Sequence, residues 1–163
     1  MKNLVKICIW GMILAPLISL LAACSEEDDC TLATRPMLYC NLYTIDEITE
    51  QVKKDTLDWL TITAIGTDSV ILNKQEKVKD LILPLNYSVD TTKIVLHYDQ
   101  EDRQTDTLLI QYTNTPYFLS MDCGYQMKQS IHSIRYTRYV LDSIHISNPE
   151  AGIYGNENIQ MFY

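Results

Sequence analysis

The chain has few glycines and histidines, and it has none of the short motifs that mark common enzymes. It contains five glycines and three histidines among 163 residues, whereas an enzyme cleft usually needs long or glycine-rich loops. No Gly-x-Ser-x-Gly elbow, phosphate-binding glycine loop or His-Glu-x-x-His motif occurs. We therefore expect no catalytic residues, and we predict that the protein is not an enzyme.

Metal-binding patterns are also missing from the sequence. There is no Cys-x-x-Cys pair, and His97, His132 and His145 lie far apart, whereas zinc ligands usually come in closely spaced pairs. The acidic cluster from Asp99 to Asp106 lacks the glycine and the terminal glutamate of an EF-hand calcium loop. We expect no metal site and no cofactor.

The N-terminus has the pattern of a bacterial lipoprotein signal. Lys2 and Lys6 precede an apolar stretch from Ile7 to Leu21, which is shorter than the roughly 20 residues of a transmembrane helix. The stretch ends in Leu-Ala-Ala-Cys24, which resembles the lipobox of lipoprotein precursors. We expect residues 1–23 to be removed and Cys24 to carry the lipid; an ordinary secretory signal is the alternative.

An acidic segment follows the lipidation site. Glu26 to Asp29 resemble the signal that sends Bacteroidetes lipoproteins to the outer face of the outer membrane, although four like charges would also form a solvated spacer. We expect residues 24–29 to be a tether and the protein to be anchored in the outer membrane, with surface display favoured over the periplasmic side. Loss of the two signal-peptide lysines shifts the net charge from −8 to about −10, which disfavours nucleic-acid binding.

Alternating apolar and polar residues predict a single all-β domain over residues 30–163. Leu38, Cys40 and Leu42 alternate with polar or aromatic residues, as expected for a half-buried strand. Similar runs occur at residues 38–43, 60–64, 69–72, 81–85, 94–98, 108–112, 117–123, 139–146 and 159–163. With turns between them, including one at 114–116, they favour an antiparallel β-sandwich of about eight or nine short strands. Pro84 indicates an edge strand or a bulge, and only residues 46–56 favour a helix.

Several phrases of the sequence resemble a known family. They are Asp29-Cys30-Thr31, Leu83-Pro84-Leu85-Asn86, Asp122-Cys123-Gly124-Tyr125 and Asn158-Ile159-Gln160-Met161-Phe162. Their succession resembles a family of uncharacterised Bacteroidetes lipoproteins, the domain-of-unknown-function family numbered sixty-four fifty-two, over residues 29–163. Because the family has no known activity, the resemblance implies a location and a fold class but no chemistry.

After removal of the signal peptide with Cys8, three cysteines remain in addition to the lipidated Cys24. Cys30 and Cys123 occupy the family-like positions, and a bridge between them is the favoured pairing outside the cytoplasm. It would close a loop of about 94 residues and stabilise the fold by roughly 4–5 kcal/mol in the chain-entropy treatment. Cys40 shares the apolar face of Leu38 and Leu42, so we expect a buried free thiol. A Cys40–Cys123 bridge and three reduced thiols are the alternatives.

One tripeptide recurs: Asp, then Ser or Thr, then an aliphatic residue or Thr. It occurs five times, against roughly one match expected from the composition. The tripeptide resembles the O-glycosylation sequence of the Bacteroidetes periplasm, and the candidate acceptors are Thr56, Ser69, Thr91, Thr107 and Ser143. Asp-Thr and Asp-Ser also suit the end of a turn that enters a strand, which would explain the pattern without modification.

Two binding functions are favoured, and an enzyme whose carboxylates converge only in the fold is the third alternative. A small tethered sandwich suits an accessory protein that binds another envelope component, such as an outer-membrane β-barrel protein or its assembly machinery. A surface glycan-binding module is the alternative, with Tyr39, Tyr43 and Trp59, or Tyr136 and Tyr139, stacking on sugar rings. Burial of these aromatic residues in the core would argue against the second function.

Overall fold

The computed structural model describes residues 35–46, 48–67, 69–99, 104–121, 123–152 and 155–163. These residues form eleven strands and no helix, so the predicted all-β fold class is confirmed. In the described part of the chain, no helix is long and apolar enough to cross a membrane. The predictions for the signal peptide, Cys24, the acidic tether and Cys30 lie outside the described residues.

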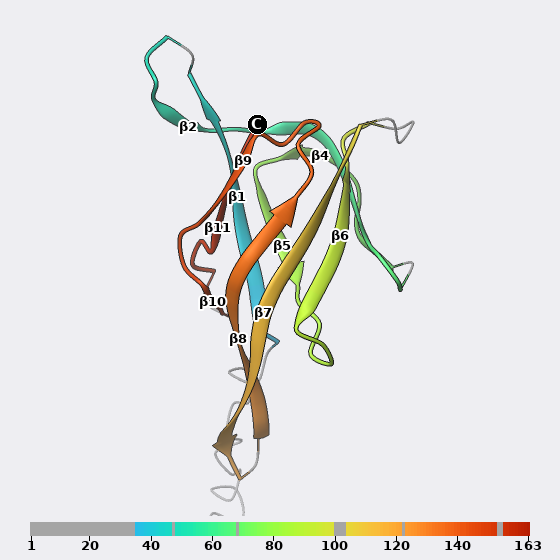
Figure 1. Ribbon diagram of the computed structural model, residues 1–163, viewed down its shortest axis with the longest axis vertical. Coiled ribbons are helices and arrows are strands. Elements are labelled where there is room, and N and C mark those ends of the chain that lie inside the picture. Colours follow the sequence, from blue (N-terminus) through green and yellow to red (C-terminus); the bar gives the residue numbers. More distant parts are fainter. Residues whose placement is uncertain (1–34, 47, 68, 100–103, 122, 153–154) are drawn as a thin grey trace, which may run out of the picture. The chain divides into compact units, whose positions relative to one another are not determined.

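The strands form two sheets (Figure 1). The first contains, in spatial order, β2 (Val52–Lys54), β1 (Met37–Ile45), β11 (Ile159–Phe162) and β9 (Ser143–Ile146), and β5 (Asp80–Pro84) also pairs with β1. The second contains, in spatial order, β10 (Glu150–Ala151), β8 (Gly124–Tyr136), β7 (Thr105–Ser120), β6 (Thr91–His97), β3 (Leu57–Ala64) and β4 (Ser69–Val78).

The described strand pairs are antiparallel except one. β11 runs parallel to β1, with Cys40 opposite Ile159 and Leu42 opposite Met161, so the last strand lies between β1 and β9. β2, β8 and β10 were not predicted, and the runs predicted at 108–112 and 117–123 belong to the single strand β7. These differences account for eleven strands instead of eight or nine.

The core is built from alternate residues of strands in both sheets. In β1 the buried side chains are Leu38, Cys40 and Leu42, as their alternation predicts. The core also includes Leu60, Ile62, Val78, Leu81, Leu83, Leu85, Ile94, Leu96, Leu108, Ile110, Tyr112, Ile131, Leu141, Ile159 and Met161. Each fully buried aliphatic side chain contributes about 1.5–3 kcal/mol relative to exposure, so this cluster is the main source of stability.

β7 and β8 form a hairpin that extends beyond the rest of their sheet (Figure 1). β6 pairs with β7 only as far as Gln111, whereas β7 and β8 remain paired up to Ser120 and Gly124. The predicted turn at residues 114–116 is therefore wrong. Pro116 is tolerated in β7 because no second described strand pairs with this stretch, and a strand edge does not need the missing N–H. We call residues 115–128 of this hairpin the β7–β8 arm.

The predicted strand over residues 139–146 is shorter than expected because a buried carboxylate holds its first part in a loop. Asp106 is buried, and its carboxylate accepts hydrogen bonds from the Thr137 hydroxyl (2.6 Å) and from the N–H groups of Tyr139 (2.9 Å), Val140 (2.9 Å) and Leu141 (2.8 Å). These N–H groups cannot also pair with a neighbouring strand. β9 accordingly begins only at Ser143.

The weak helix prediction for residues 46–56 is wrong. Lys53 and Lys54 lie in β2, which pairs antiparallel with the end of β1. The Asp46 carboxylate accepts hydrogen bonds from the N–H groups of Ile48 (3.1 Å) and Thr49 (3.0 Å). Such a side-chain bond to the following backbone favours a turn over a helix.

Replacement of Asp106 tests whether its carboxylate holds residues 137–141 in their loop. Burial raises the pKa of Asp106, but its hydrogen bonds with Thr137, Leu141, Tyr139 and Val140 outweigh that effect, so the pKa is lower in the folded protein. The stabilisation is therefore complete above the unfolded pKa of about 3.9 and is lost as the pH falls through the folded pKa. Asp106→Asn should lower the free energy of unfolding by about 2–4 kcal/mol at pH 7.

Urea unfolding at pH 7 and pH 3 measures this effect, and the difference between wild type and Asp106→Asn should shrink at pH 3. Asp142→Asn is the control, because Asp142 is an exposed residue paired with Arg138, and exposed pairs contribute only about 0–1 kcal/mol. Equal losses for the two variants at pH 7 would contradict the assignment.

Candidate functional site

The most distinctive surface feature lies where the chain passes from one sheet to the other. β4 ends at Val78, β5 begins at Asp80, and only Lys79 separates them. Within the described residues, β4 pairs only with β3, and β5 pairs only with β1. Both strands therefore have an unpaired edge, and the prediction from Pro84 that its strand lies at an edge is confirmed.

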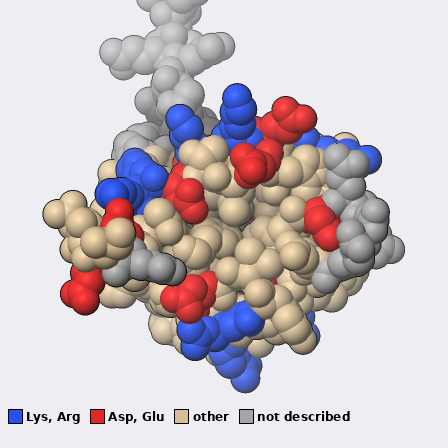
Figure 2. All heavy atoms as spheres, turned by 90° about the horizontal axis from the view of Figure 1, so that it is seen from above, with Lys and Arg blue, Asp and Glu red and all other residues tan. Residues whose placement is uncertain are grey.

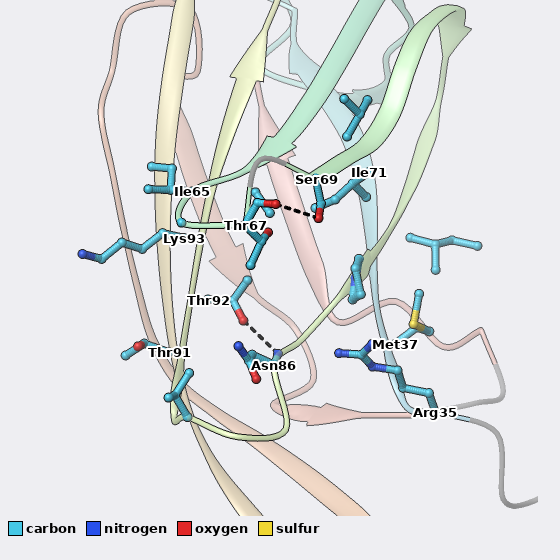
Figure 3. A pocket seen from close by; sticks show the side chains of 16 residues that line it. Arg35, Met37, Ile65, Thr67, Ser69, Ile71, Asn86, Thr91, Thr92 and Lys93 are labelled. Carbon is cyan, nitrogen blue, oxygen red and sulfur yellow. Dashed lines mark hydrogen bonds between the residues drawn. The ribbon is translucent and has the colours of Figure 1, made fainter.

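A groove lies between these two strands (Figure 3). It holds one cavity of about 810 Å³ and a second of about 230 Å³. Ile71 of β4 and Ile82 of β5 line both cavities, which shows that the two adjoin. The larger cavity is also lined by Arg35, Met37, Ala64, Ile65, Gly66, Thr67, Ser69, Val70, Pro84, Asn86, Val89, Thr91, Thr92 and Lys93. We call this feature the β4–β5 groove.

Aliphatic side chains dominate the rim and the floor of the β4–β5 groove. Ile65, Val70, Ile82 and Val89 are large apolar residues that line the larger cavity yet remain about half exposed. The smaller cavity reaches buried core residues, including Ile62. The groove is therefore a place where exposed apolar side chains adjoin the buried core, and apolar surface of this kind often marks a binding site.

The two strand edges differ in how well they are protected from further pairing. In the second half of β4, Lys74 and Lys77 have positive φ angles of 47° and 53°, and lysines and irregular backbone both discourage the addition of another strand. In β5, Pro84 lacks an N–H. The first part of β4, Ser69 to Ile71, has no lysine and no positive φ angle, although its register with β3 shifts between Val70 and Leu72 and places a bulge at Ile71. It is therefore the less protected part of this edge, and the part where an incoming strand would pair.

A polar wall closes one end of the larger cavity (Figure 3). The Arg35 guanidinium donates a hydrogen bond to the Leu85 carbonyl and lies 4.5 Å from the centre of the Tyr87 ring. Lys93, by contrast, directs its ammonium group away from the other lining residues. The Asn86 N–H donates a hydrogen bond to the Thr92 hydroxyl (3.0 Å). This end of the groove thus offers a cation and polar groups, unlike the apolar rim.

Buried polar side chains fix the loop that carries this wall. The Tyr112 hydroxyl donates to the Asn86 carbonyl (2.9 Å) and accepts from the Asn86 N–H (2.8 Å). The Asn114 side-chain amide donates to the Val89 carbonyl (2.9 Å), and Gln129 donates to the Asn114 side-chain oxygen (2.8 Å). Because these bonds hold both ends of the loop, the groove is pre-formed, which lowers the entropic cost of binding.

Figure 2 shows the face that lies at the top in Figure 1, and this face carries charges of both signs. Lysine and arginine side chains alternate with aspartate and glutamate around a largely uncharged middle. This face therefore carries no large field of a single sign. The β4–β5 groove is likewise mostly apolar, so shape and backbone pairing rather than net charge would select its ligand.

The aromatic residues predicted to bind sugars do not form one platform. Tyr43 stacks on Phe162 at a ring distance of 5.7 Å and donates a hydrogen bond to Glu157 (2.6 Å). Trp59 lies in β3, in the other sheet. Tyr136 packs against the core, whereas Tyr139 is exposed. Tyr39 and Tyr43 both lie in β1, but Trp59 lies in the other sheet, so the structure does not bring the three predicted residues together.

The recurrent Asp-Ser/Thr tripeptides have structural roles. The aspartate of four tripeptides is described, and in each case its carboxylate accepts a hydrogen bond. The donors are the Thr56 N–H for Asp55, the Asn114 N–H for Asp90, the Thr137 hydroxyl for Asp106 and the Arg138 guanidinium for Asp142. Thr56, Ser69, Thr91 and Ser143 lie at or next to the start of a strand, whereas Thr107 lies inside β7. Ser69 is exposed, and the other four are half-buried. Their glycosylation stays a prediction; Ser69 and Thr91 line the groove.

The cysteines differ in their state. Cys40 is a buried free thiol, as predicted, and its burial, assisted by the charge of Glu157, raises its pKa. Cys123 is disulfide-bonded. Its predicted partner, Cys30, lies outside the described residues, so the Cys30–Cys123 pairing stays a prediction, whereas the Cys40–Cys123 alternative is excluded.

No group of three or more His, Cys, Asp or Glu side chains in the described part of the chain could hold a metal ion. His132 contacts the Thr113 hydroxyl in the second sheet, while His145 lies in β9 of the first sheet. The acidic cluster considered for calcium is only partly described, and its last member, Asp106, has the anchoring role given above.

Residues 59–163 match the family described as "Family of unknown function (DUF6452)". The chain therefore belongs to this family, as its sequence phrases suggested, although the match begins at Trp59 and leaves the first phrase, Asp29-Cys30-Thr31, outside it. The matched region contains β4, β5 and the loop between β5 and β6, and thus most of the groove. No curated protein and no solved structure matches the chain.

Peptide mapping tests the cysteine assignments. After brief alkylation of the native protein without reductant, the peptides that contain Cys30 and Cys123 should remain joined. Cys40 should react only after unfolding, because burial blocks access and raises its pKa. Alkylation of Cys123 before reduction, or rapid labelling of Cys40 in the native protein, would contradict these assignments.

Proposed function

We propose that this protein is a non-enzymatic outer-membrane lipoprotein, anchored through Cys24, that binds an extended segment of another envelope protein in the β4–β5 groove. The observation that carries the proposal is the pair of unpaired strand edges on either side of an open apolar groove. An incoming strand can take its affinity from main-chain hydrogen bonds to such an edge, and its specificity from alternate side chains that enter pockets.

The dimensions and chemistry of the groove suit an extended peptide better than a compact ligand. Ser69 to Ile71 offer backbone groups on the edge of β4 that no described strand covers, and Val70, Ile71 and Ile82 offer apolar contacts in the same cavity. In a strand, successive side chains alternate between two faces. An apolar residue at every second position of the incoming segment would therefore contact the groove.

An outer-membrane β-barrel protein, or a component that assembles such proteins, fits these requirements. Before a barrel closes, its strands have unpaired backbone groups and alternate apolar residues. A lipoprotein anchored in the same membrane would meet such segments at a high local concentration. The lipobox-like sequence at Cys24 supports the shared location.

The composition of the groove supports a binding role rather than catalysis. The described residues that line the larger cavity include no His, Cys, Asp or Glu, and its one lysine, Lys93, directs its ammonium group away from the other lining residues (Figure 3). The smaller cavity is lined by one carboxylate, that of Asp80. A general acid or base must lie within hydrogen-bond reach of the substrate. Ser69 is present, but its hydroxyl donates to the Thr67 carbonyl at 3.3 Å.

Site-specific crosslinking in living cells tests the proposal. A photo-crosslinking amino acid replaces Val70 in one variant and Val52 in the control, because these valines are 56% and 55% exposed and Val52 lies in β2, outside the groove. The Val70 variant should form at least about fivefold more crosslink to an outer-membrane β-barrel protein or assembly component. Val70→Asp should reduce co-purification of that partner about tenfold or more, whereas Val52→Asp should not.

Equal crosslinking from the two positions, or full co-purification with Val70→Asp, would count against the groove. Saturable binding of a polysaccharide that is lost in Trp59→Ala, without a protein partner, would instead support the glycan-binding alternative. Circular dichroism of each variant checks that the fold is intact.

A further inference from the structure

The end of the β7–β8 arm carries a cluster of exposed apolar and aromatic side chains. Tyr117, Phe118, Met121 and Tyr125 are all exposed. Phe118 and Tyr125 face each other across the two strands, with ring centres 5.4 Å apart in an edge-to-face arrangement. Ser120 accepts a hydrogen bond from the Cys123 N–H (3.0 Å), which tightens the turn between the strands. We call these four side chains the tip cluster.

The described chain begins beside the base of the same arm (Figure 1). Met37, at the start of β1, pairs with Gly152, and the adjacent β10 pairs with Gln129 and Ser130 of β8. From Gln129 to the tip the arm continues for about five residues, or roughly 17 Å at 3.4 Å per residue. The tip cluster therefore lies on the same side of the domain as Arg35 and Met37, to which the N-terminal segment is joined.

The length of that segment keeps the tip cluster within reach of a membrane. Eleven residue steps separate Cys24 from Arg35, and an extended chain of that length spans at most about 36–40 Å. This span exceeds the roughly 17 Å by which the arm projects. If the predicted Cys30–Cys123 bridge forms, the tip is joined to the chain only six residues from Cys24, which shortens the reach to about 20 Å.

We propose that the tip cluster inserts into the polar–apolar interface of the phospholipid bilayer that holds the lipid anchor. The inference rests on the anchor at Cys24 but not on the β4–β5 groove. A second contact point, in addition to the acyl chains, fixes the orientation of the domain on the membrane. The opposite end of the domain is then directed away from the bilayer.

The chemistry of the tip cluster matches a bilayer interface. Tyrosine has an apolar ring and a polar hydroxyl, and it is enriched where membranes meet water. Met121 and Phe118 supply apolar area that can enter the acyl region. The chain as a whole is acidic, so this contact depends on apolar and aromatic groups rather than on attraction to anionic lipid.

Tryptophan fluorescence in vesicles tests the inference with the lipidated, full-length mature protein. Tyr125→Trp places an indole in the tip cluster, and Tyr139→Trp is the matched control, because these tyrosines are 74% and 81% exposed and lie near opposite ends of β8. Both variants carry Trp59→Phe, so that the introduced indole is the sole tryptophan of the mature chain. The vesicles contain phosphatidylcholine brominated on its acyl chains, which quenches indoles that enter the bilayer.

The Tyr125→Trp protein should be quenched at least about threefold more than the Tyr139→Trp protein. Replacing Phe118 and Met121 by Ser in the first variant should reduce the quenching towards that of the control. Equal quenching at the two positions, in protein that carries lipid and floats with the vesicles, overturns this inference and leaves the proposed function standing. Protein that carries no lipid and does not float overturns both.

Discussion

The passage of the chain through Lys79 is the constraint on which the candidate site depends. The Lys79 carbonyl accepts a hydrogen bond from the Leu42 N–H (3.1 Å), while Val78 on one side and Leu81 on the other are buried in the core. The corner is therefore fixed at a point where β4 belongs to one sheet and β5 to the other. Since β4 and β5 diverge from Lys79, they cannot pair with each other along their length. No other described strand covers their outer edges, so the groove lies between two open edges.

The opposite side of the groove is held by polar groups rather than by apolar packing. Tyr112 and Asn114 bind the loop after β5 through its own carbonyl and N–H groups, and Asp106 does the same for the loop after β8. A buried polar group that is fully bonded specifies one loop conformation, because any other would leave it without partners. The corner at Lys79 keeps the groove open, and the hydrogen bonds to the loop after β5 give it a defined shape.

The sequence predicted best those elements in which one face of a strand is buried and the other exposed. Leu108, Ile110 and Tyr112 alternate in β7, and they are buried as expected. β8 was missed because its signal differs: Gln129 is buried and polar, and Ile131 is its one fully buried apolar residue. A strand that lies partly in a projecting arm has no continuous apolar face, so its periodicity is weak.

The candidate site was less accessible to prediction than the fold. Pro84 indicated an edge strand, but nothing in the local sequence shows that β4 and β5 lie in different sheets, since this depends on pairings between distant residues such as Leu38 and Leu83. The same holds for the parallel pair of β1 and β11, which joins the two ends of the domain. Besides Pro84, the lysines at 74 and 77 are a local sign of a protected edge, and they become informative only once the strand order is known.

The open edge of β4 can be measured directly by amide hydrogen exchange on the free protein. The account predicts that the amides at Ser69 to Leu72 that point away from β3 exchange at least about a hundredfold faster than those at Ile94 to Leu96 in β6, which has a neighbour on each side. If these β4 amides are protected as strongly as those of β6, the edge is already covered in the free protein, and the central claim of an open binding groove is contradicted.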